Sequence, residues 1–172
     1  MLRVALWMLA ALLCGLWAAI APRAHAQSRG VCNPTIPRFV SLKRSKTNVR
    51  VGPGKQYPVR WIYQLQGLPI EIIAEFGNWR RVRGSDGSEG WVHSALLSTR
   101  RMALAAPWST MNINLRAGPR DRAATLARLQ PGVLVRIMHC DVTWCAVSVP
   151  GHDLSGYVRQ VKVWGVYPDE TI

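Results

Sequence analysis

Apolar and polar residues alternate in short runs along the chain from residue 39 onward. The runs are rich in β-branched side chains and end at clusters of Gly, Pro, Asn or Asp. This alternation predicts half-buried β-strands, and helical periodicity is nearly absent. The predicted strands are 39–42, 68–74, 79–83, 90–93, 133–138, 145–149 and 156–159.

The pattern occurs twice. The hexapeptide NVRVGP at 48–53 returns sixty-six residues later as NLRAGP at 114–119, and each copy is followed by a Trp and then by Gly-aromatic-Val. A repeat kept in register predicts one small domain used twice. We assign the repeated positions to the scaffold: Asn48, Arg50, Gly52, Pro53, Trp79, Gly90, Trp91, Asn114, Arg116, Gly118, Pro119 and Trp144.

The hexapeptide residues suit a sharp reversal of the chain. We expect both glycines to take a positive φ and both prolines to fix φ. Each Asn is expected to bond nearby backbone, and each Arg to cover the edge of the core with its stem while its guanidinium stays in water. Trp79, Trp91 and Trp144 are expected to fill the core.

The first twenty-six residues are predicted to be a cleaved secretory signal peptide. Arg3 precedes an apolar run over 4–20, and an A-x-A site follows at 24–26. The alternative is a membrane anchor, for which the run is marginal in length. The predicted domains are a signal peptide at 1–26, an irregular lead at 27–38, units at 39–99 and 107–167 joined by a connector at 100–106, and a tail at 168–172.

The chain is strongly basic, with a formal net charge of +13, and loss of Arg3 and Arg23 with the signal peptide leaves +11. This balance favours acidic partners, such as wall polymers or anionic lipid surfaces. Export makes nucleic acid the least expected of them, and no stable membrane span is expected after cleavage. A basic surface that serves solubility alone is an equally open interpretation.

Three cysteines remain after cleavage. Cys140 and Cys145 flank four residues, which suits a hairpin, and an oxidising compartment favours a disulfide between them. The alternative is a metal, since His139 is adjacent, but this cluster offers at most three ligands where structural zinc takes four. Cys32 is then a free thiol or an intermolecular link.

The two hexapeptides, the WRRV strand at 79–82 and the GWV strand at 90–92 resemble the bacterial SH3 domain family, often called SH3b. The second copy carries the resemblance at 114–119, 131–132, 144–147 and 156–158. The resemblance implies an all-β protein of two tandem SH3-like small β-barrels. It also implies export and the binding of peptides or wall components, often beside wall hydrolases. In the second copy RDRAA at 120–124 replaces GKQYP at 54–58, so the aromatic at Tyr57 is missing there.

An SH3-like groove holds extended peptides between aromatic faces and a few polar groups. We predict such a site on the first copy, with Tyr57 and Trp61 exposed. Paired arginines attract carboxylates, although they also occur as solvated sheet edges. The predicted ligand-binding residues are Tyr57, Trp61, Tyr63, Arg60 and Arg80.

No catalytic motif stands out: there is no H-E-x-x-H, no phosphate-binding loop, and no Cys–His arrangement at a helix start. We therefore expect a non-enzymatic periplasmic or secreted protein without metal or cofactor. Its expected ligand is peptide-containing cell wall (peptidoglycan) or an envelope component. The alternative is an adaptor or docking subunit of the envelope that binds a protein partner and no wall.

Overall fold

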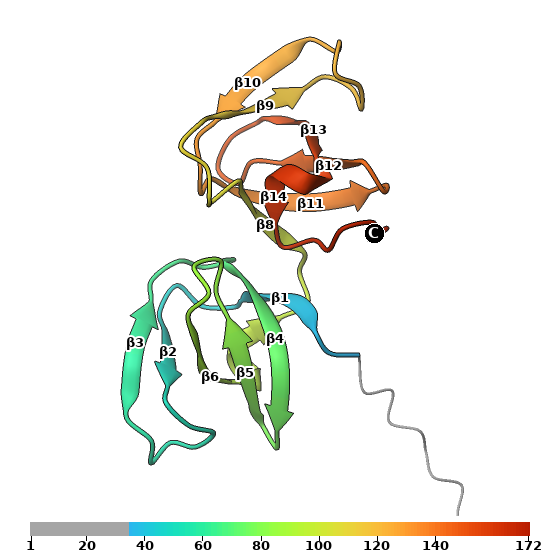
Figure 1. Ribbon diagram of the computed structural model, residues 1–172. Coiled ribbons are helices and arrows are strands. Elements are labelled where there is room, and N and C mark those ends of the chain that lie inside the picture. Colours follow the sequence, from blue (N-terminus) through green and yellow to red (C-terminus); the bar gives the residue numbers. More distant parts are fainter. Residues whose placement is uncertain (1–34) are drawn as a thin grey trace, which may run out of the picture. The chain divides into compact units, whose positions relative to one another are not determined.

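The computed structural model describes residues 35–172, which fold into β-strands and two short 3-10 helices (Figure 1). The predicted signal peptide and Cys32 lie outside the described residues. The first half contains β1 (Arg38–Leu42), β2 (Thr47–Arg50), β3 (Val59–Tyr63), β4 (Pro69–Phe76), β5 (Trp79–Arg83), β6 (Glu89–His93), η1 (Ser94–Leu96) and β7 (Leu97–Ser98). The second half contains β8 (Met102–Ala105), β9 (Ile113–Arg116), β10 (Thr125–Leu129), β11 (Leu134–Cys140), β12 (Trp144–Ser148), β13 (Ser155–Arg159), η2 (Gln160–Lys162) and β14 (Val163–Trp164).

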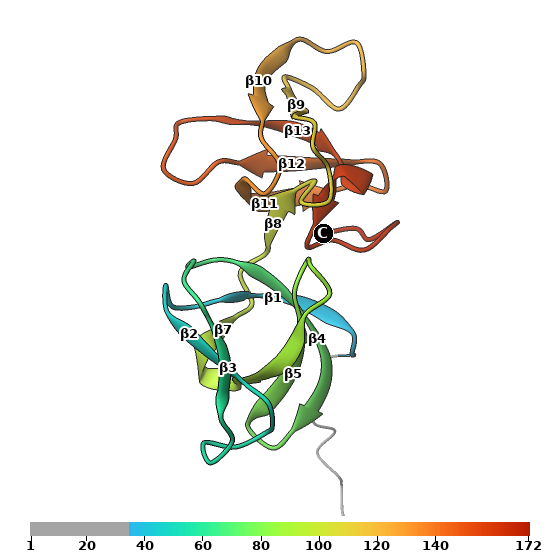
Figure 2. The same ribbon diagram turned by 60° about the vertical axis from the view of Figure 1, so that its left-hand side comes forward.

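The two halves have the same topology. The first sheet runs β3-β2-β6-β5-β4-β1-β7, and the second runs β10-β9-β13-β12-β11-β8-β14, so each strand has its counterpart seven strands later. All pairings are antiparallel. The prediction of an all-β tandem repeat is confirmed. The sheets are not closed barrels, however, because the hydrogen-bonded order of each has two different end strands, β3 and β7 in the first and β10 and β14 in the second. Figure 2 shows the strands of both halves from a second direction.

Each sheet encloses its own apolar core. In the first, Val49, Ile70 and Val82 are fully buried, and in the second Leu115, Val135 and Val147 are their counterparts. Along β2 and β9 the aliphatic residue of the hexapeptide points inward while Asn and Arg alternate outward, as the pleat of a strand requires. The repeated sequence therefore builds two equivalent outer faces.

The seven predicted strands are all found, with ends that differ by at most two residues. Alternation did not predict β2, β3, β9 and β10, which are polar or carry exposed apolar residues. The expected connector at 100–106 contains β8, which pairs with β11 and β14. Its sequence MALA is buried at all four positions, so it lacks the alternation that marks a half-buried strand.

The predicted disulfide between Cys140 and Cys145 is confirmed. The two residues face each other across the β11–β12 hairpin, and both are fully buried in the core of the second half. No helix within residues 35–172 has the length and apolar character needed to cross a membrane.

Candidate functional site

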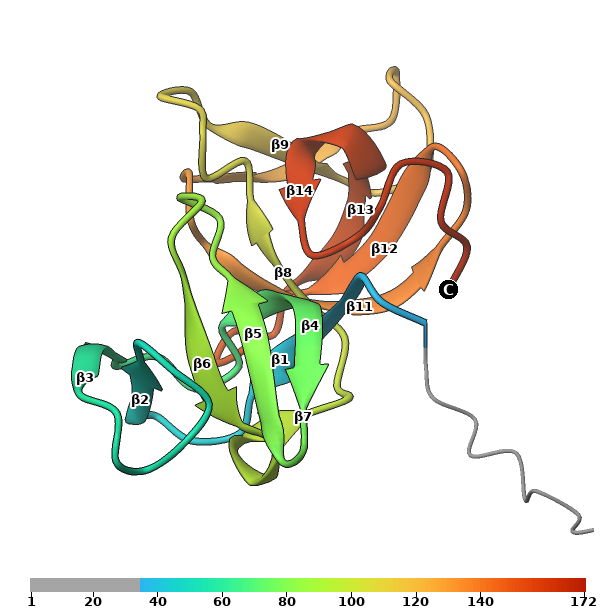
Figure 3. The same ribbon diagram turned by 60° about the horizontal axis from the view of Figure 1, so that its bottom comes forward.

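The hexapeptides lead into two long loops with the same backbone hydrogen bonds. In the first loop, between β2 and β3, the Gly54 amide donates to the Gly52 carbonyl at 3.0 Å, and the Tyr57 amide donates to the Gly54 carbonyl at 3.3 Å. In the second loop, the Arg120 amide donates to the Gly118 carbonyl at 2.8 Å, and the Ala123 amide donates to the Arg120 carbonyl at 3.1 Å. The loop is thus built twice despite different sequences after the hexapeptide. Figure 3 shows the first loop beside β2 and β3.

The hexapeptide arginine braces this loop in both copies. Arg50 donates from Nη1 to the carbonyl of Tyr57 at 2.6 Å, and Arg116 donates from Nη1 to the carbonyl of Ala123 at 2.9 Å. Each guanidinium therefore has a role beyond the expected one, since it ties the far end of the loop to its strand. Among the hydrogen bonds of residues 35–172, none involves the side chain of Asn48 or Asn114, so the expected Asn–backbone bond is also corrected. Both asparagines are exposed.

The hexapeptide glycines have a different role from the one expected. Neither Gly52 nor Gly118 has a positive φ. At Gly52 a Cβ would lie 2.5 Å from Cδ1 of Tyr57, because that ring packs directly on the glycine. At Gly118 the nearest atom, Cβ of Ala123, would be 3.8 Å away, an ordinary contact. Close approach of an aromatic ring, and not backbone conformation, therefore accounts for the first glycine.

A groove of about 310 Å³ lies against the first loop. Asn48 and Arg50 enter it from β2, Lys55 from the loop, Trp79 from β5 and His93 from β6, and Ala95 and Leu96 of η1 close one end. The rings of Trp79 and His93 meet edge to face, with 5.3 Å between their centroids. We call these seven residues the first groove.

The polar groups of the first groove are mostly donors. Nδ1 of His93 accepts a hydrogen bond from the Ala95 amide at 3.2 Å, which leaves Nε2 as the protonated nitrogen of the neutral ring. Arg50 and Lys55 add positive charge, and no lining residue is acidic. Positively charged donors beside an aromatic floor suit a ligand with acceptor oxygens, and a carboxylate best of all.

An equivalent groove of about 270 Å³ lies on the second half. Asn114, Arg116 and Trp144 replace Asn48, Arg50 and Trp79, whereas Asp121 stands where the first groove has Lys55 and Arg159 stands where it has His93. The second groove is lined by Ser109, Met111, Asn112, Ile113, Asn114, Arg116, Asp121, Trp144, Arg159 and Lys162.

The second groove is covered by its own side chains. The guanidinium of Arg159 lies 4.7 Å from the centre of the Trp144 ring, within cation–π distance. Its Nε also donates to Asp121 Oδ1 at 3.2 Å, and its Nη2 contacts the other carboxylate oxygen. Trp144 is 7% exposed, whereas Trp79 is half-buried. The two grooves therefore have similar volumes, but Arg159 covers the tryptophan face in the second copy.

The predicted aromatic residues lie beside the first groove and do not line it. Tyr57 is 39% exposed, but Trp61 is half-buried and packs with Tyr63 against the core, so its expected exposure is corrected. The rings of Trp61 and Tyr63 meet edge to face at 6.0 Å, and the guanidinium carbon of Arg60 is 5.6 Å from the Trp61 ring. Arg60, Trp61 and Tyr63 form one cluster on β3, and Tyr57 lies in the loop before it. The four residues stay a predicted binding surface.

Arg80 is separate from this cluster. Its Nε is 3.1 Å from a carboxylate oxygen of Glu75, and its Nη1 donates to the carbonyls of Gly77 and Trp79. Within residues 35–172, no hydrogen bond or ion pair joins Arg80 to Tyr57, Trp61, Tyr63 or Arg60. The Arg80 guanidinium therefore binds acceptors at the β4–β5 turn.

The three tryptophans expected to fill the cores all lie outside the apolar core clusters. Trp144 is 7% exposed, and Trp79 and Trp91 are half-buried. They stand on the outer face because they share the alternation of Arg81 and not that of Val82 on the paired strands β5 and β6. Trp79 and His93 in the first groove are therefore functional candidates that the sequence did not reveal. One sequence signal could have revealed this groove: the two copies differ at equivalent positions, Lys55 against Asp121 and His93 against Arg159.

The acidic residues near the turns have structural roles. Hydrogen bonds from the Ser88 hydroxyl and amide hold the pKa of Asp86 below its usual range, and the amides of Trp144 and Thr143 do the same for the pKa of Asp141. Within residues 35–172, no group of three His, Cys, Asp or Glu side chains is placed to hold a metal ion.

The family model described as the bacterial SH3 domain matches this chain twice, over residues 43–99 and 110–165. The chain belongs to the bacterial SH3 domain family. Each match covers one sheet apart from its first strand, β1 or β8, and contains the loop and the groove of that half except for Ser109. Family membership accounts for the duplicated topology and for the equivalent grooves.

Individual relatives are more distant. YrvJ of Bacillus subtilis (strain 168), named a putative N-acetylmuramoyl-L-alanine amidase, is 23% identical over 130 residues, which cover 71% of this chain and 24% of YrvJ. The chain thus spans about a quarter of the length of this curated relative. Solved structures that match include NlpC2 from Trichomonas vaginalis, with 11% identity, a TM-score of 0.32 and coverage of 74% of this chain and 48% of that one. An NlpC/P60 family protein from Bacillus cereus ATCC 10987 has 11% identity and a TM-score of 0.33, and the match covers 73% of this chain and 55% of that one.

Proposed function

We propose that this protein is an exported, non-enzymatic binding module that recognises peptide-containing cell wall through the first groove. The observation that carries the proposal is the contrast between the copies. The first groove presents Trp79 with donors from Lys55 and His93, whereas in the second groove Arg159 covers Trp144 and pairs with Asp121. A free aromatic face with charged donors is the kind of surface that binds a ligand, while a covered one contributes to stability.

The chemistry of the groove favours peptides that carry carboxylates. Arg50 uses one N–H of Nη1 for the loop and keeps its other N–H groups, so Arg50, Lys55 and Nε2 of His93 are the donors that the groove offers to a ligand. A carboxylate accepts charge-assisted hydrogen bonds from such groups, and the Trp79 face contacts the aliphatic part of the same ligand. Wall peptides combine these two features. The basic net charge of the chain would speed encounter with an acidic polymer.

Two further features support the proposal. The family to which the chain belongs is that of bacterial SH3 domains, and the name of YrvJ refers to an enzyme that cleaves wall material. A cleaved leader at 1–26 would place the protein in the periplasm or outside the cell, where the wall is. Peptidoglycan is therefore the proposed partner, and the basic surface is proposed to add affinity for it.

Co-sedimentation of the protein with purified insoluble peptidoglycan tests this proposal. Lys55→Glu should reduce the bound fraction about tenfold at 0.15 M salt, where charges more than ~8 Å apart are screened. Lys46→Glu is the matched control, because it changes the net charge by the same amount. Lys46 is exposed and lies outside both grooves. Equal losses in the two variants, or binding that disappears with salt, would reduce the interaction to nonspecific attraction.

Tyr57→Ala, in the same assay, separates the groove from the predicted aromatic cluster. Binding that survives Lys55→Glu and fails with Tyr57→Ala would move the site to the cluster around β3. Absence of wall binding by the native protein would reject the proposal and leave the adaptor function. Size in solution, with and without reductant, then shows whether the protein assembles with itself or requires an envelope partner.

A further inference from the structure

A hollow of about 380 Å³ lies on the first half, where the ends of β1 and β7 meet the turn before β4. Three of its lining residues are cationic and none is acidic. The lining residues, which we call the basic hollow, are Ser41, Leu42, Lys43, Arg44, Gln66, Gly67, Ser98 and Arg100. None of them lines the first groove, so the basic hollow is a separate site.

Hydrogen bonds hold the three segments of the basic hollow together. Nε2 of Gln66 donates to the Lys43 carbonyl at 3.1 Å, which ties the turn before β4 to the end of β1. Oγ of Ser41 donates to the Arg100 carbonyl at 2.8 Å, and the Arg100 amide donates to Oγ of Ser98 at 3.2 Å. The fold therefore sets the backbone of the hollow, and binding a ligand there costs little ordering of the chain.

The three cations of the basic hollow, Lys43, Arg44 and Arg100, are exposed. Within residues 35–172, no hydrogen bond or ion pair involves any of their side chains. Other arginines are paired: Arg83 and Arg101 each contact a glutamate carboxylate, at 2.7 and 2.9 Å. A hollow lined by charges of one sign concentrates ions of the opposite sign, so the basic hollow favours an anion.

The second half has the equivalent face without these charges. The amides of Lys43 and Ala106 donate to the last residue of η1 and of η2 respectively, both at 2.8 Å, so Ala106 is the counterpart of Lys43. Pro107 then takes the place of Arg44. Because the same backbone forms with and without the cations, the fold does not require them.

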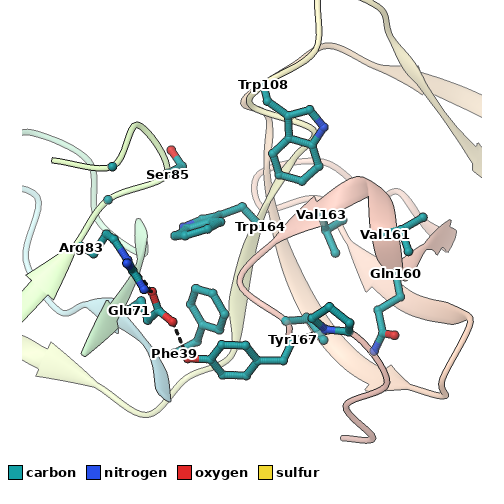
Figure 4. A pocket seen from close by; sticks show the side chains of 14 residues that line it. Phe39, Glu71, Arg83, Ser85, Trp108, Gln160, Val161, Val163, Trp164 and Tyr167 are labelled. Atoms are coloured by element: carbon teal, nitrogen blue, oxygen red, sulfur yellow. Dashed lines mark hydrogen bonds and ion pairs between the residues drawn. The ribbon is translucent and has the colours of Figure 1, made fainter. Parts of the chain in front are cut away.

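Two further positions of this face also differ. Trp164 and Val166 stand where the first half has Ser98 and Arg100. Figure 4 shows Trp164 beside Phe39 of the first half, and the two rings meet edge to face with 5.1 Å between their centroids. The second copy thus uses Trp164 for packing within the chain, whereas the first copy presents its cations to solvent.

The chemistry of the basic hollow suits a phosphate group at a lipid surface. Arg44 and Arg100 each offer a planar fork of N–H groups, which matches phosphate oxygens, and Lys43 adds a third charge. Leu65 is 44% exposed and directly precedes Gln66 of the hollow. Basic side chains beside an exposed apolar one combine the two forces that hold a protein on anionic lipid, whereas a free phosphate gains nothing from the leucine.

We propose that the basic hollow holds the protein on membranes that contain anionic phospholipid. A lipid phosphate lies between the guanidinium groups of Arg44 and Arg100, and Leu65 enters the headgroup region. Lys46, exposed on the loop between β1 and β2, adds attraction to the same surface. The first groove consists of other residues, so this inference goes beyond the proposed function: one chain contacts the wall and the membrane through separate sites.

Co-sedimentation with vesicles tests this inference at about 0.15 M salt, where distant charges are screened. The native protein should bind vesicles that mix phosphatidylcholine with phosphatidylglycerol, and should not bind phosphatidylcholine alone. Arg44→Gln/Arg100→Gln should weaken binding about tenfold or more, because two basic contacts with the lipid surface are lost. Arg120→Gln/Arg122→Gln is the matched control, since both side chains are exposed outside the hollow and the change in net charge is the same. This control should lose no more than about twofold.

Two further arms distinguish a lipid surface from a free phosphate. Leu65→Ser should weaken vesicle binding severalfold, and glycerol 3-phosphate in solution should bind far more weakly than the mixed vesicles do. Equal losses in the two double variants, no binding of the mixed vesicles by the native protein, or glycerol 3-phosphate binding as tight as vesicle binding would overturn the inference. Thermal unfolding of all variants should match that of the native protein, because the substituted side chains are exposed. Arg44→Gln/Arg100→Gln should bind peptidoglycan as its matched control does, so failure of the hollow and failure of the first groove give different results.

Discussion

At the scale of single residues, Gly90 and Gly156 occupy positions where a side chain has no room. A Cβ on Gly90 would lie 2.4 Å from Cγ1 of Val49, and one on Gly156 would lie 2.5 Å from the carbonyl oxygen of Arg116. In both copies the glycine lets the hexapeptide strand pass close to the strand that carries the Gly-aromatic-Val motif. The motif is therefore explained by packing between strands.

Gly156→Ala should lower the free energy of unfolding by about 1–3 kcal/mol, the cost of forcing a methyl group into a packed site. The neighbour it meets is backbone, which cannot rotate away. Denaturant unfolding at constant pH measures the change. Gly118→Ala is the matched control in the same half: its Cβ meets nothing closer than 3.8 Å and its φ is not positive. If both variants unfold alike, strand approach does not explain the motif.

At the scale of elements, the β11–β12 hairpin is held by the Cys140–Cys145 disulfide and by Asp141, which caps the turn through the amides of Thr143 and Trp144. The double variant Cys140→Ala/Cys145→Ala should lose about 2 kcal/mol of stability, the chain-entropy value for so short a loop. Denaturant unfolding with and without reductant checks this. Reductant should destabilise the native protein and leave the variant unchanged; a variant as stable as the native protein would contradict the prediction.

The two grooves can also be compared as elements, because two positions distinguish the groove whose tryptophan is covered by Arg159 from the groove whose tryptophan is not. Asp121→Lys with Arg159→His gives the second groove the pattern of Lys55 and His93 and removes the cover over Trp144. We expect wall binding in co-sedimentation to rise severalfold, through a second site on the same chain. The single variant Asp121→Asn controls for loss of the ion pair alone. Unchanged binding in the double variant would mean that the groove pattern does not determine affinity.

At the scale of the whole molecule, the Tyr167–Glu71 hydrogen bond joins the two halves. Burial, and then the neighbouring Glu71 carboxylate, raise the pKa of Tyr167 well above its ordinary value of 10.0. The folded state therefore keeps its proton where the unfolded state loses it, so this contribution to stability is complete below pH ~10 and declines as pH rises further.

Tyr167→Phe should remove this alkaline decline and also weaken the contact, because one oxygen of the buried Glu71 is left without a partner. A loss of about 1–3 kcal/mol at neutral pH is expected, the cost of an unsatisfied buried acceptor. Thermal unfolding of both proteins between pH 7 and about pH 11, across the ordinary tyrosine pKa, gives the comparison. Parallel stability curves for the two proteins would show that Tyr167 does not titrate with folding.

The duplicated all-β architecture, seven of the strands and the disulfide were predictable from the sequence alone. These follow from local signals: alternation, turn residues, the repeated hexapeptide and the spacing of Cys140 and Cys145. The sequence did not reveal β8, because a strand buried on both faces does not alternate, nor the polar strands β2 and β9. Local patterns report which face of a strand is buried, and they do so only where its two faces differ.

The role of each side chain became visible in the folded protein. The position of Gly52 must be a glycine because the Tyr57 ring packs on it, and Arg50 braces the loop because it reaches the Tyr57 carbonyl. Trp79 lines the first groove because it lies on the outer face. Each of the two grooves combines residues from distant parts of the chain. Their contacts depend on how the strands pair and pack, and side chains far apart in sequence leave no local pattern from which to predict such contacts.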